Sequence, residues 1–129
     1  TVIRFAGLYG PGREIASFLK TGRVSMREGN APVNLIHLDD CIGIVTAVIQ
    51  KDSMGQIFNA CADAHPIRKN LYIHAAIAMG LNPPEFMENE YPPYKIICND
   101  KVRNLLGYRF IHPGPWRWID DQSKKKPLM

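Results

Sequence analysis

The chain begins with an apolar segment that runs directly into a glycine-rich turn. Val2–Ala6 is apolar except for Arg4 and includes β-branched residues, and three glycines and a proline lie within the next six residues, Gly7–Gly12. This pattern predicts a buried strand that leaves a sheet through a Gly/Pro turn, followed by a helix over Glu14–Lys20. A buried strand of this kind is rarely the first in a parallel sheet, so we expect neighbouring strands on residues upstream of Thr1.

Strand and helix patterns alternate along the rest of the chain. The predicted strands cover Val33–Leu38, Gln56–Cys61 and Lys95–Cys98, and the predicted helices cover Cys41–Gln50, Pro66–Met79 and the segment from Asn99, its expected cap, to Gly107. Such alternation predicts an α/β fold with parallel strands. Because so few strands would make only a thin domain, we expect the C-terminal edge strands and the helical lobe of a doubly wound, Rossmann-type parallel sheet.

Four side chains have predicted roles in this framework. Asp39 or Asp40 is expected to cap the helix Cys41–Gln50, because a carboxylate can accept hydrogen bonds from the free N–H groups of the first turn. That helix is apolar on more than one side, so we expect it to be well buried. Trp116 and Trp118 are too large to be left exposed, and we expect them to pack on the domain or on a partner.

Length, charge and hydropathy exclude several classes of protein. A chain of 129 residues can bury one hydrophobic core but not two domains. The net charge of +4 does not indicate nucleic-acid binding, because Lys124–Lys126 supplies three of these charges and the other basic residues are scattered. The longest uncharged apolar stretch, Cys41–Ile49, is too short to cross a bilayer. We therefore predict no nucleic acid and no membrane among the partners.

The cysteines and histidines show no metal-binding or disulfide pattern. The three cysteines, Cys41, Cys61 and Cys98, form no CxxC pair, and the first two lie in apolar patterns typical of small core residues. This usage favours a reducing compartment, so we expect a cytoplasmic protein. The four histidines are far apart and lack metal-ligand spacing, so no metal site is predicted.

Three local patterns invite a catalytic or cofactor-binding interpretation. The glycines of Gly7–Gly12 have the wrong spacing for a pyrophosphate loop, Pro11 stiffens the turn, and no acidic residue ends a second strand about 20 residues later. Tyr91–Lys95 matches Y-x-x-x-K, but two intervening prolines exclude the helix that this pair requires. His37 beside two aspartates could form a general-base pair, although its place between a strand and a helix favours a structural role.

Four segments resemble one enzyme family in the family's own order. Arg4–Arg13 resembles the strand and turn that follow the family's catalytic helix, and Leu35–Asp40 resembles its Ile-His-Val-Asp-Asp segment. Gly55–Ala60 resembles the next strand, and Asn99–Tyr108 resembles a late helix with the pattern Asn-x-Lys-x-Arg-x-x-Leu-Gly-Tyr/Trp. The family is that of the extended short-chain dehydrogenases/reductases, the NAD-dependent epimerase/dehydratase family. The resemblance implies that residues 1–113 form the C-terminal, substrate-binding region of such an enzyme and that residues 114–129 form a Trp- and Lys-rich tail.

The resemblance also implies where ligands would bind. Ala6, Gly7 and Leu8 would lie near the nicotinamide end of NAD or NADP in a full-length parent, because ligands bind beyond the carboxyl ends of parallel strands. The residues expected to face a small-molecule substrate are Tyr9, Arg13, Asn34 and His37. The catalytic Tyr and Lys would lie in an upstream, cofactor-binding half. This chain would then contain no catalytic residue and would bind no cofactor alone.

Two functions are compatible with these observations. The chain is either the substrate-binding part of an NAD(P)-dependent oxidoreductase or epimerase/dehydratase, or a non-catalytic interaction module that retains part of the fold. Gly7 and Val33 stand where nucleotide-sugar enzymes of the family usually have Asn and Arg, and a neutral Val33 cannot bind a diphosphate, so a nucleotide-sugar substrate is not favoured. Without an upstream half, the open edge of Val2–Ala6 is expected to self-associate.

Overall fold

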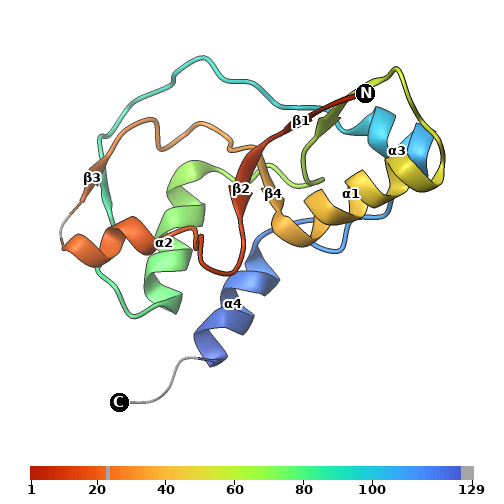
Figure 1. Cartoon of the computed structure of the whole chain (residues 1–129). Helices are drawn as coiled ribbons and strands as arrows, with labels where there is room; N and C mark the ends of the chain where they lie inside the picture. Colours follow the sequence, from red (N-terminus) through yellow and green to blue (C-terminus); the bar gives the residue numbers. More distant parts are fainter. Residues whose placement is uncertain (23, 126–129) are drawn as a thin grey trace.

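The computed structural model describes residues 1–22 and 24–125, and its strands and helices alternate along the chain (Figure 1). The strands are β1 Val2–Phe5, β2 Gly7–Tyr9, β3 Ser25–Met26, β4 Leu35–His37, β5 Ile57–Ala60 and β6 Glu85–Phe86. The helices are α1 Leu38–Gln50, α2 Arg68–Ala78, α3 Asp100–Leu106 and α4 Trp116–Lys124, and a 3₁₀-helix, η1, covers Ser17–Thr21.

The described strands form three parallel pairs, β1 with β5, β2 with β4 and β3 with β6. The first extended segment of the chain, which contains β1 and β2, changes its pairing partner at Ala6. The Ala6 N–H donates to the carbonyl of Ala60 on the β5 side at 3.0 Å, whereas the Gly7 N–H donates to the carbonyl of Asn34 on the β4 side at 3.0 Å. The predicted α/β fold with parallel pairing is therefore confirmed. Strand β1 pairs with β5 and β2 pairs with β4, so two consecutive strands of one segment have different neighbours.

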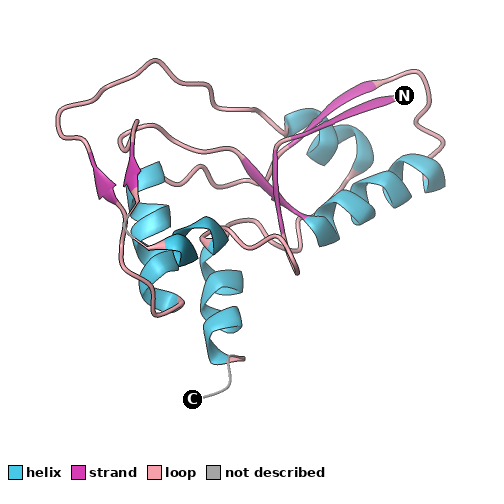
Figure 2. Cartoon of the chain, turned by 60° about the vertical axis from the view of Figure 1, so that its left-hand side comes forward, coloured by secondary structure: helices cyan, strands magenta, loops and turns pink. Residues whose placement is uncertain are grey.

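Two clusters of buried side chains stabilise the chain, one at each end. The first joins α1, β5 and α3 and includes Ile44, Phe58 and Leu106. Figure 2 shows the β1–β5 pair alongside α1 at this end of the molecule. The second cluster joins β2, η1, α2 and α4 and includes Leu71 and Trp118. Cys41 and Cys61 are buried, Cys61 completely, which confirms their prediction as small core residues.

Two predicted elements are wrong. Glu14–Lys20 is not an α-helix, because its first residues are turns and only Ser17–Thr21 forms a 3₁₀-helix. Lys95–Cys98 is not a strand. The side chain of Asn34 supplies the hydrogen bonds that a neighbouring strand would have supplied, since its Nδ2 donates to the Lys95 carbonyl at 2.8 Å and its Oδ1 accepts from the Ile97 N–H at 2.9 Å.

The ends of two helices also differ from the prediction. Asn99 does precede α3, but its Nδ2 donates to the Cys61 carbonyl at 2.8 Å and to Asp63 at 2.7 Å, and its side chain does not cap the helix. Gly107 ends α3 in the left-handed conformation, with φ of 60°, as predicted. Trp116–Lys124 forms a helix, α4, that the sequence analysis left in the tail.

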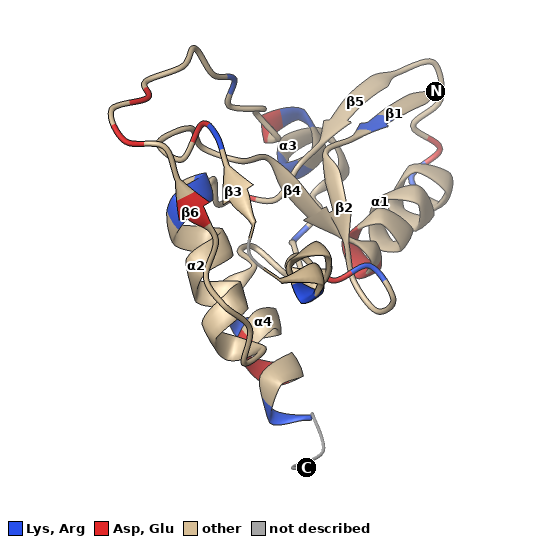
Figure 3. Cartoon of the chain, turned by 90° about the vertical axis from the view of Figure 1, so that its left-hand side faces the viewer, with Lys and Arg blue, Asp and Glu red and all other residues tan. Residues whose placement is uncertain are grey.

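Charged residues of both signs are distributed over the chain (Figure 3). An ion pair joins Arg27 to Glu90 at 3.1 Å and links the loops that flank β3 and β6. Within residues 1–22 and 24–125, no helix has the length and apolar character that a membrane crossing requires.

Candidate functional site

The aromatic and acidic residues of the candidate site meet at the carboxyl ends of β2 and β4. Tyr9 ends β2, and His37 ends β4 and precedes α1. The loop before α4 contributes His112, and α4 itself contributes Trp118. Parallel strands bring their carboxyl ends to one edge of a sheet, which is the usual location of a ligand site in this class of fold.

His37 is almost completely enclosed by three aromatic rings. Its ring stacks on that of His112, with centroids 3.8 Å apart and planes at 24°, and the rings of Tyr9 and Trp118 meet it edge-on at 5.0 and 5.3 Å. Its Nδ1 accepts the Asp39 N–H at 2.9 Å and so caps α1. The predicted cap by Asp39 or Asp40 is therefore wrong, because His37, two residues before Asp39, already accepts the hydrogen bond from the N–H group at the start of the helix.

Asp40 has a different role, as a buried carboxylate that binds the segment after α3. Its Oδ1 accepts the Tyr108 hydroxyl and the Ile111 N–H, both at 2.7 Å, and its Oδ2 accepts the His112 N–H at 3.0 Å. Gly43 lies on the same side of α1, where an added Cβ would come within 2.8 Å of the Tyr108 ring. Asp40 therefore positions the loop that stacks His112 on His37.

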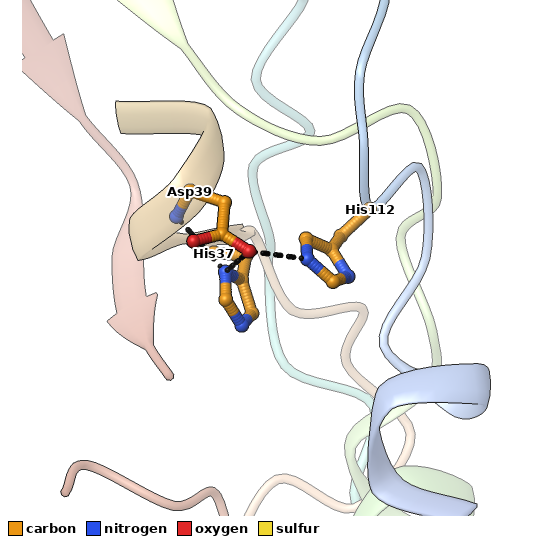
Figure 4. A group of neighbouring side chains, drawn as sticks. All are labelled: His37, Asp39 and His112. Atoms are coloured by element: carbon orange, nitrogen blue, oxygen red, sulfur yellow. Dashed lines mark hydrogen bonds and ion pairs between the residues drawn. The ribbon is translucent and has the colours of Figure 1, made fainter. Parts of the chain in front are cut away.

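Figure 4 shows that Asp39 lies beside the two stacked histidines. The Asp39 Oδ2 is 3.0 Å from His112 Nε2 and 3.5 Å from His37 Nδ1, so these three residues could together offer ligand atoms to a metal ion. The geometry does not suit one, because the Nδ1 lone pair of His37 already accepts the Asp39 N–H. In addition, the lone pairs of stacked rings run side by side and do not converge on one point.

Burial changes the protonation equilibria of several side chains in the molecule. Burial and the Asp40 charge raise the pKa of Tyr9, and burial and the hydrogen bond to Asp40 raise the pKa of Tyr108, so both phenols stay protonated at neutral pH. Burial raises the pKa of the Cys41 and Cys61 thiols to about 11. Thiols of this kind are poor nucleophiles, in agreement with a core role.

The pKa of His37 predicts how stability depends on pH. Burial first, and the neighbouring His112 second, lower this pKa below the ordinary value of 6.5, although Asp39 and Asp40 act in the opposite direction. The unfolded chain therefore binds a proton in a pH range where the folded chain does not. The stabilising contribution of neutral His37 is complete above pH 6.5 and is lost as the pH falls through the lowered pKa of the folded state.

We therefore expect the free energy of unfolding to fall more steeply as the pH is lowered below 6.5 in the natural chain than in a His37→Asn variant. Asparagine can still accept the Asp39 N–H but does not titrate. Urea unfolding over this pH range measures both slopes. Parallel pH profiles for the two proteins would show that His37 does not contribute.

The structure places the four residues predicted to face a substrate in different environments. Tyr9 and His37 come together, but they are only 2% and 1% exposed. Asn34 uses its amide to hold the backbone of residues 95–97. Arg13 is exposed, and its Nε donates to the Leu8 carbonyl at 3.1 Å. Substrate contact stays a prediction for all four, and of them Arg13 is the residue that solvent reaches most freely.

The predicted cofactor-facing residues lie where the first segment changes partner. Ala6 is half-buried, Gly7 is exposed, and Leu8 is exposed and lines an apolar cavity of about 110 Å³ with Arg13 and Leu38. A Cβ added to Gly7 would lie 3.1 Å from the Asn34 carbonyl oxygen and 3.2 Å from the Leu35 side chain. The absence of a side chain at Gly7 therefore allows β2 to pack closely against β4.

The sequence analysis missed the parts of the site that come from the last third of the chain. His112 and Trp118 meet residues of β2 and β4 that lie far from them in sequence. The one available signal was the Pro/Trp-rich composition of His112–Trp118, which indicated packing but not the partner.

Comparison with known proteins supports this description of the fold. No family profile matches the sequence. Protein YeeZ of Escherichia coli K12 is 39% identical over 115 residues, which are 88% of this chain and 41% of that protein. A solved structure of a human epimerase family protein, SDR39U1 with NADPH, superposes with a TM-score of 0.75 at 13% identity, over 97% of this chain and 48% of its own.

The chain has the fold of the C-terminal half of the NAD-dependent epimerase/dehydratase family. A more distant relative by sequence, the 3-diazoavenalumate denitrifying reductase of a Streptomyces species, is 28% identical over 136 residues, which cover 90% of this chain and 44% of that enzyme. The chain thus spans less than half the length of the curated relatives that it matches. The resemblance inferred from the four sequence segments is confirmed at the level of the fold.

Proposed function

We propose that this chain forms the substrate-binding half of an NAD(P)-dependent oxidoreductase or epimerase/dehydratase. The observation that carries the proposal is the change of partner at Ala6, where β1 pairs with β5 and β2 pairs with β4. Strands that diverge to two neighbours open a crevice at their carboxyl ends, and in α/β sheets ligands bind there. Exposed Gly7 and Leu8 line this position and would contact the nicotinamide end of the cofactor.

The comparisons support a nicotinamide cofactor and redox chemistry. NADPH or NAD is named in the titles of several solved structures with this fold, and one sequence relative is named a reductase. In this proposal the pyrophosphate loop and the catalytic Tyr and Lys belong to the half that precedes β1. The chain itself supplies the wall of the ligand crevice around Arg13 and Leu38. The complete protein would work in a reducing, cytoplasmic compartment.

Cofactor titration tests the proposal. We expect the 129-residue chain alone to give no measurable NADPH or NADH binding by calorimetry, and the polypeptide encoded by the complete reading frame to bind one of them. In the longer protein, Leu8→Glu should weaken binding, because it places a charge at the apolar nicotinamide site. Ile77→Glu, at an exposed position on α2, is the matched control and should bind normally.

Two results would contradict the proposal. Low-micromolar binding by the 129-residue chain alone would show that Gly7–Gly12 is a pyrophosphate loop after all. A longer protein that folds but binds neither cofactor would favour the non-catalytic interaction module.

A further inference from the structure

A cavity of about 440 Å³ lies between α3, the segment after it and the loop that follows β5. The residues around it include Asp63, Arg103, Gly107, Tyr108, Arg109 and Phe110, and we call it the arginine cavity. Its volume is that of a small-molecule site. None of the described residues around it lines the cavity beside Leu8, where the proposed function places the nicotinamide, so the arginine cavity requires an explanation of its own.

Hydrogen bonds hold the acidic side of the arginine cavity in place. Asn99 is 8% exposed, and its Nδ2 donates to the Cys61 carbonyl at 2.8 Å and to Asp63 Oδ1 at 2.7 Å. The Nε of Arg103 lies 3.9 Å from the same Oδ1 atom. Among the described residues, Asp63 Oδ2 has no hydrogen-bond donor, so this oxygen can accept a hydrogen bond from a ligand.

The buried carboxylate of Asp40 holds the basic side of the cavity. The Tyr108 hydroxyl and the Ile111 N–H both donate to its Oδ1 at 2.7 Å. Arg109 lies between these two anchored residues, so its backbone is fixed at the cavity. Its exposed guanidinium has no hydrogen-bond or ion-pair partner in residues 1–22 and 24–125. The walls are therefore held before a ligand arrives, which lowers the entropic cost of binding.

Positive charge predominates around the arginine cavity. Arg103 and Arg109 both line it, and the Nζ of Lys51 lies 3.2 Å from the position that a Cβ on Gly107 would take. Asp63 supplies the one carboxylate among the described lining residues. One guanidinium fork already satisfies the two oxygens of a carboxylate ligand, whereas a phosphate group offers three terminal oxygens and a charge of about −2. Two arginines from different segments therefore suit a phosphate better than a carboxylate.

We propose that the arginine cavity binds a phosphate monoester that also carries a hydroxyl group. Arg103 and Arg109 donate to the phosphate oxygens, and Asp63 Oδ2 accepts from the hydroxyl. The rings of Tyr108 and Phe110 meet edge-on with centroids 5.2 Å apart and supply an apolar wall for the carbon skeleton. This site goes beyond the proposed function, because its ligand contacts need neither a nicotinamide cofactor nor an upstream half.

Calorimetric titration with glycerol 3-phosphate tests the site, in the 129-residue chain and in the polypeptide from the complete reading frame. We expect glycerol 3-phosphate to bind roughly tenfold more tightly than inorganic phosphate, because only the ester has hydroxyl groups for Asp63. Glycerol alone should not bind. Arg109→Ala should weaken the binding of both phosphates by roughly tenfold. Arg4→Ala removes the same charge from an exposed position on β1 and is the matched control, with unchanged affinity.

Conservative variants separate ligand contacts from structural roles. Arg109→Lys keeps the charge but loses the guanidinium fork, so it should weaken binding less than Arg109→Ala. Asp63→Asn should reduce the preference for glycerol 3-phosphate over inorganic phosphate without weakening the binding of inorganic phosphate, which a purely structural role of Asp63 would not produce. Circular dichroism checks that each variant is folded. Equal losses for Arg109→Ala and Arg4→Ala would overturn the site, as would equal affinities for the two phosphates or no binding at millimolar ligand.

Discussion

Asp40→Ala is expected to lower the free energy of unfolding by roughly 3–5 kcal/mol. The carboxylate is completely buried and accepts the Tyr108 hydroxyl and the backbone N–H groups of Ile111 and His112. Alanine would leave three donors without an acceptor and would create a cavity beside Gly43. This effect is several times the loss of about 1 kcal/mol expected if Asp40 were only a helix cap. Urea unfolding measured by circular dichroism gives the value.

Two variants separate the contributions of the three hydrogen bonds. Asp40→Asn keeps one acceptor oxygen but places an amide group near the remaining N–H donor, so its loss should be smaller than that of alanine. Tyr108→Phe removes only the hydroxyl and should cost about 1–2 kcal/mol. If Asp40→Ala costs no more than Tyr108→Phe, the carboxylate does not hold the backbone of residues 111–112 in solution.

Local patterns were sufficient to predict most of the framework. The apolar runs and the Gly and Pro residues around them located β1, β4, β5 and the helices α1, α2 and α3 to within a few residues of their ends. The prediction failed where a side chain makes the hydrogen bonds that a neighbouring strand or the expected capping residue would have made. Asn34 hydrogen-bonds the segment 95–97 in place of a strand, and His37 caps α1 in place of an aspartate.

The candidate site could not be predicted because its contacts are distant in sequence. Asp40 and Tyr108 are 68 residues apart, and local rules assign a carboxylate at the start of a helix to capping. Helix α4 was missed for a related reason. It has only nine residues and follows a Pro/Gly-rich segment, so its apolar periodicity is too short to be recognised, and its partners lie on β2, β4 and α2.

Trp118→Ala is expected to cost roughly 3–5 kcal/mol of unfolding free energy, as a large-to-small change in a core does. Trp118 is 8% exposed, and its ring meets those of Tyr9 and His37 at 5.4 and 5.3 Å, so the prediction that it packs on the domain or a partner is confirmed for the domain itself. Its removal would detach α4 from the ends of β2 and β4 and would expose the His37 ring to water.

Trp116→Ala is the matched control for this change. Trp116 lies in the same helix but is 36% exposed, and its ring contact is with His74 on α2, at 5.2 Å. We expect it to cost about 1 kcal/mol, which is the contribution of a single aromatic pair. Chemical unfolding of the two variants gives the comparison. The ring of Trp118 in α4 meets those of Tyr9 and His37, so a loss for Trp118→Ala no larger than that for Trp116→Ala would contradict its role in closing the site and would leave His37 open to a substrate.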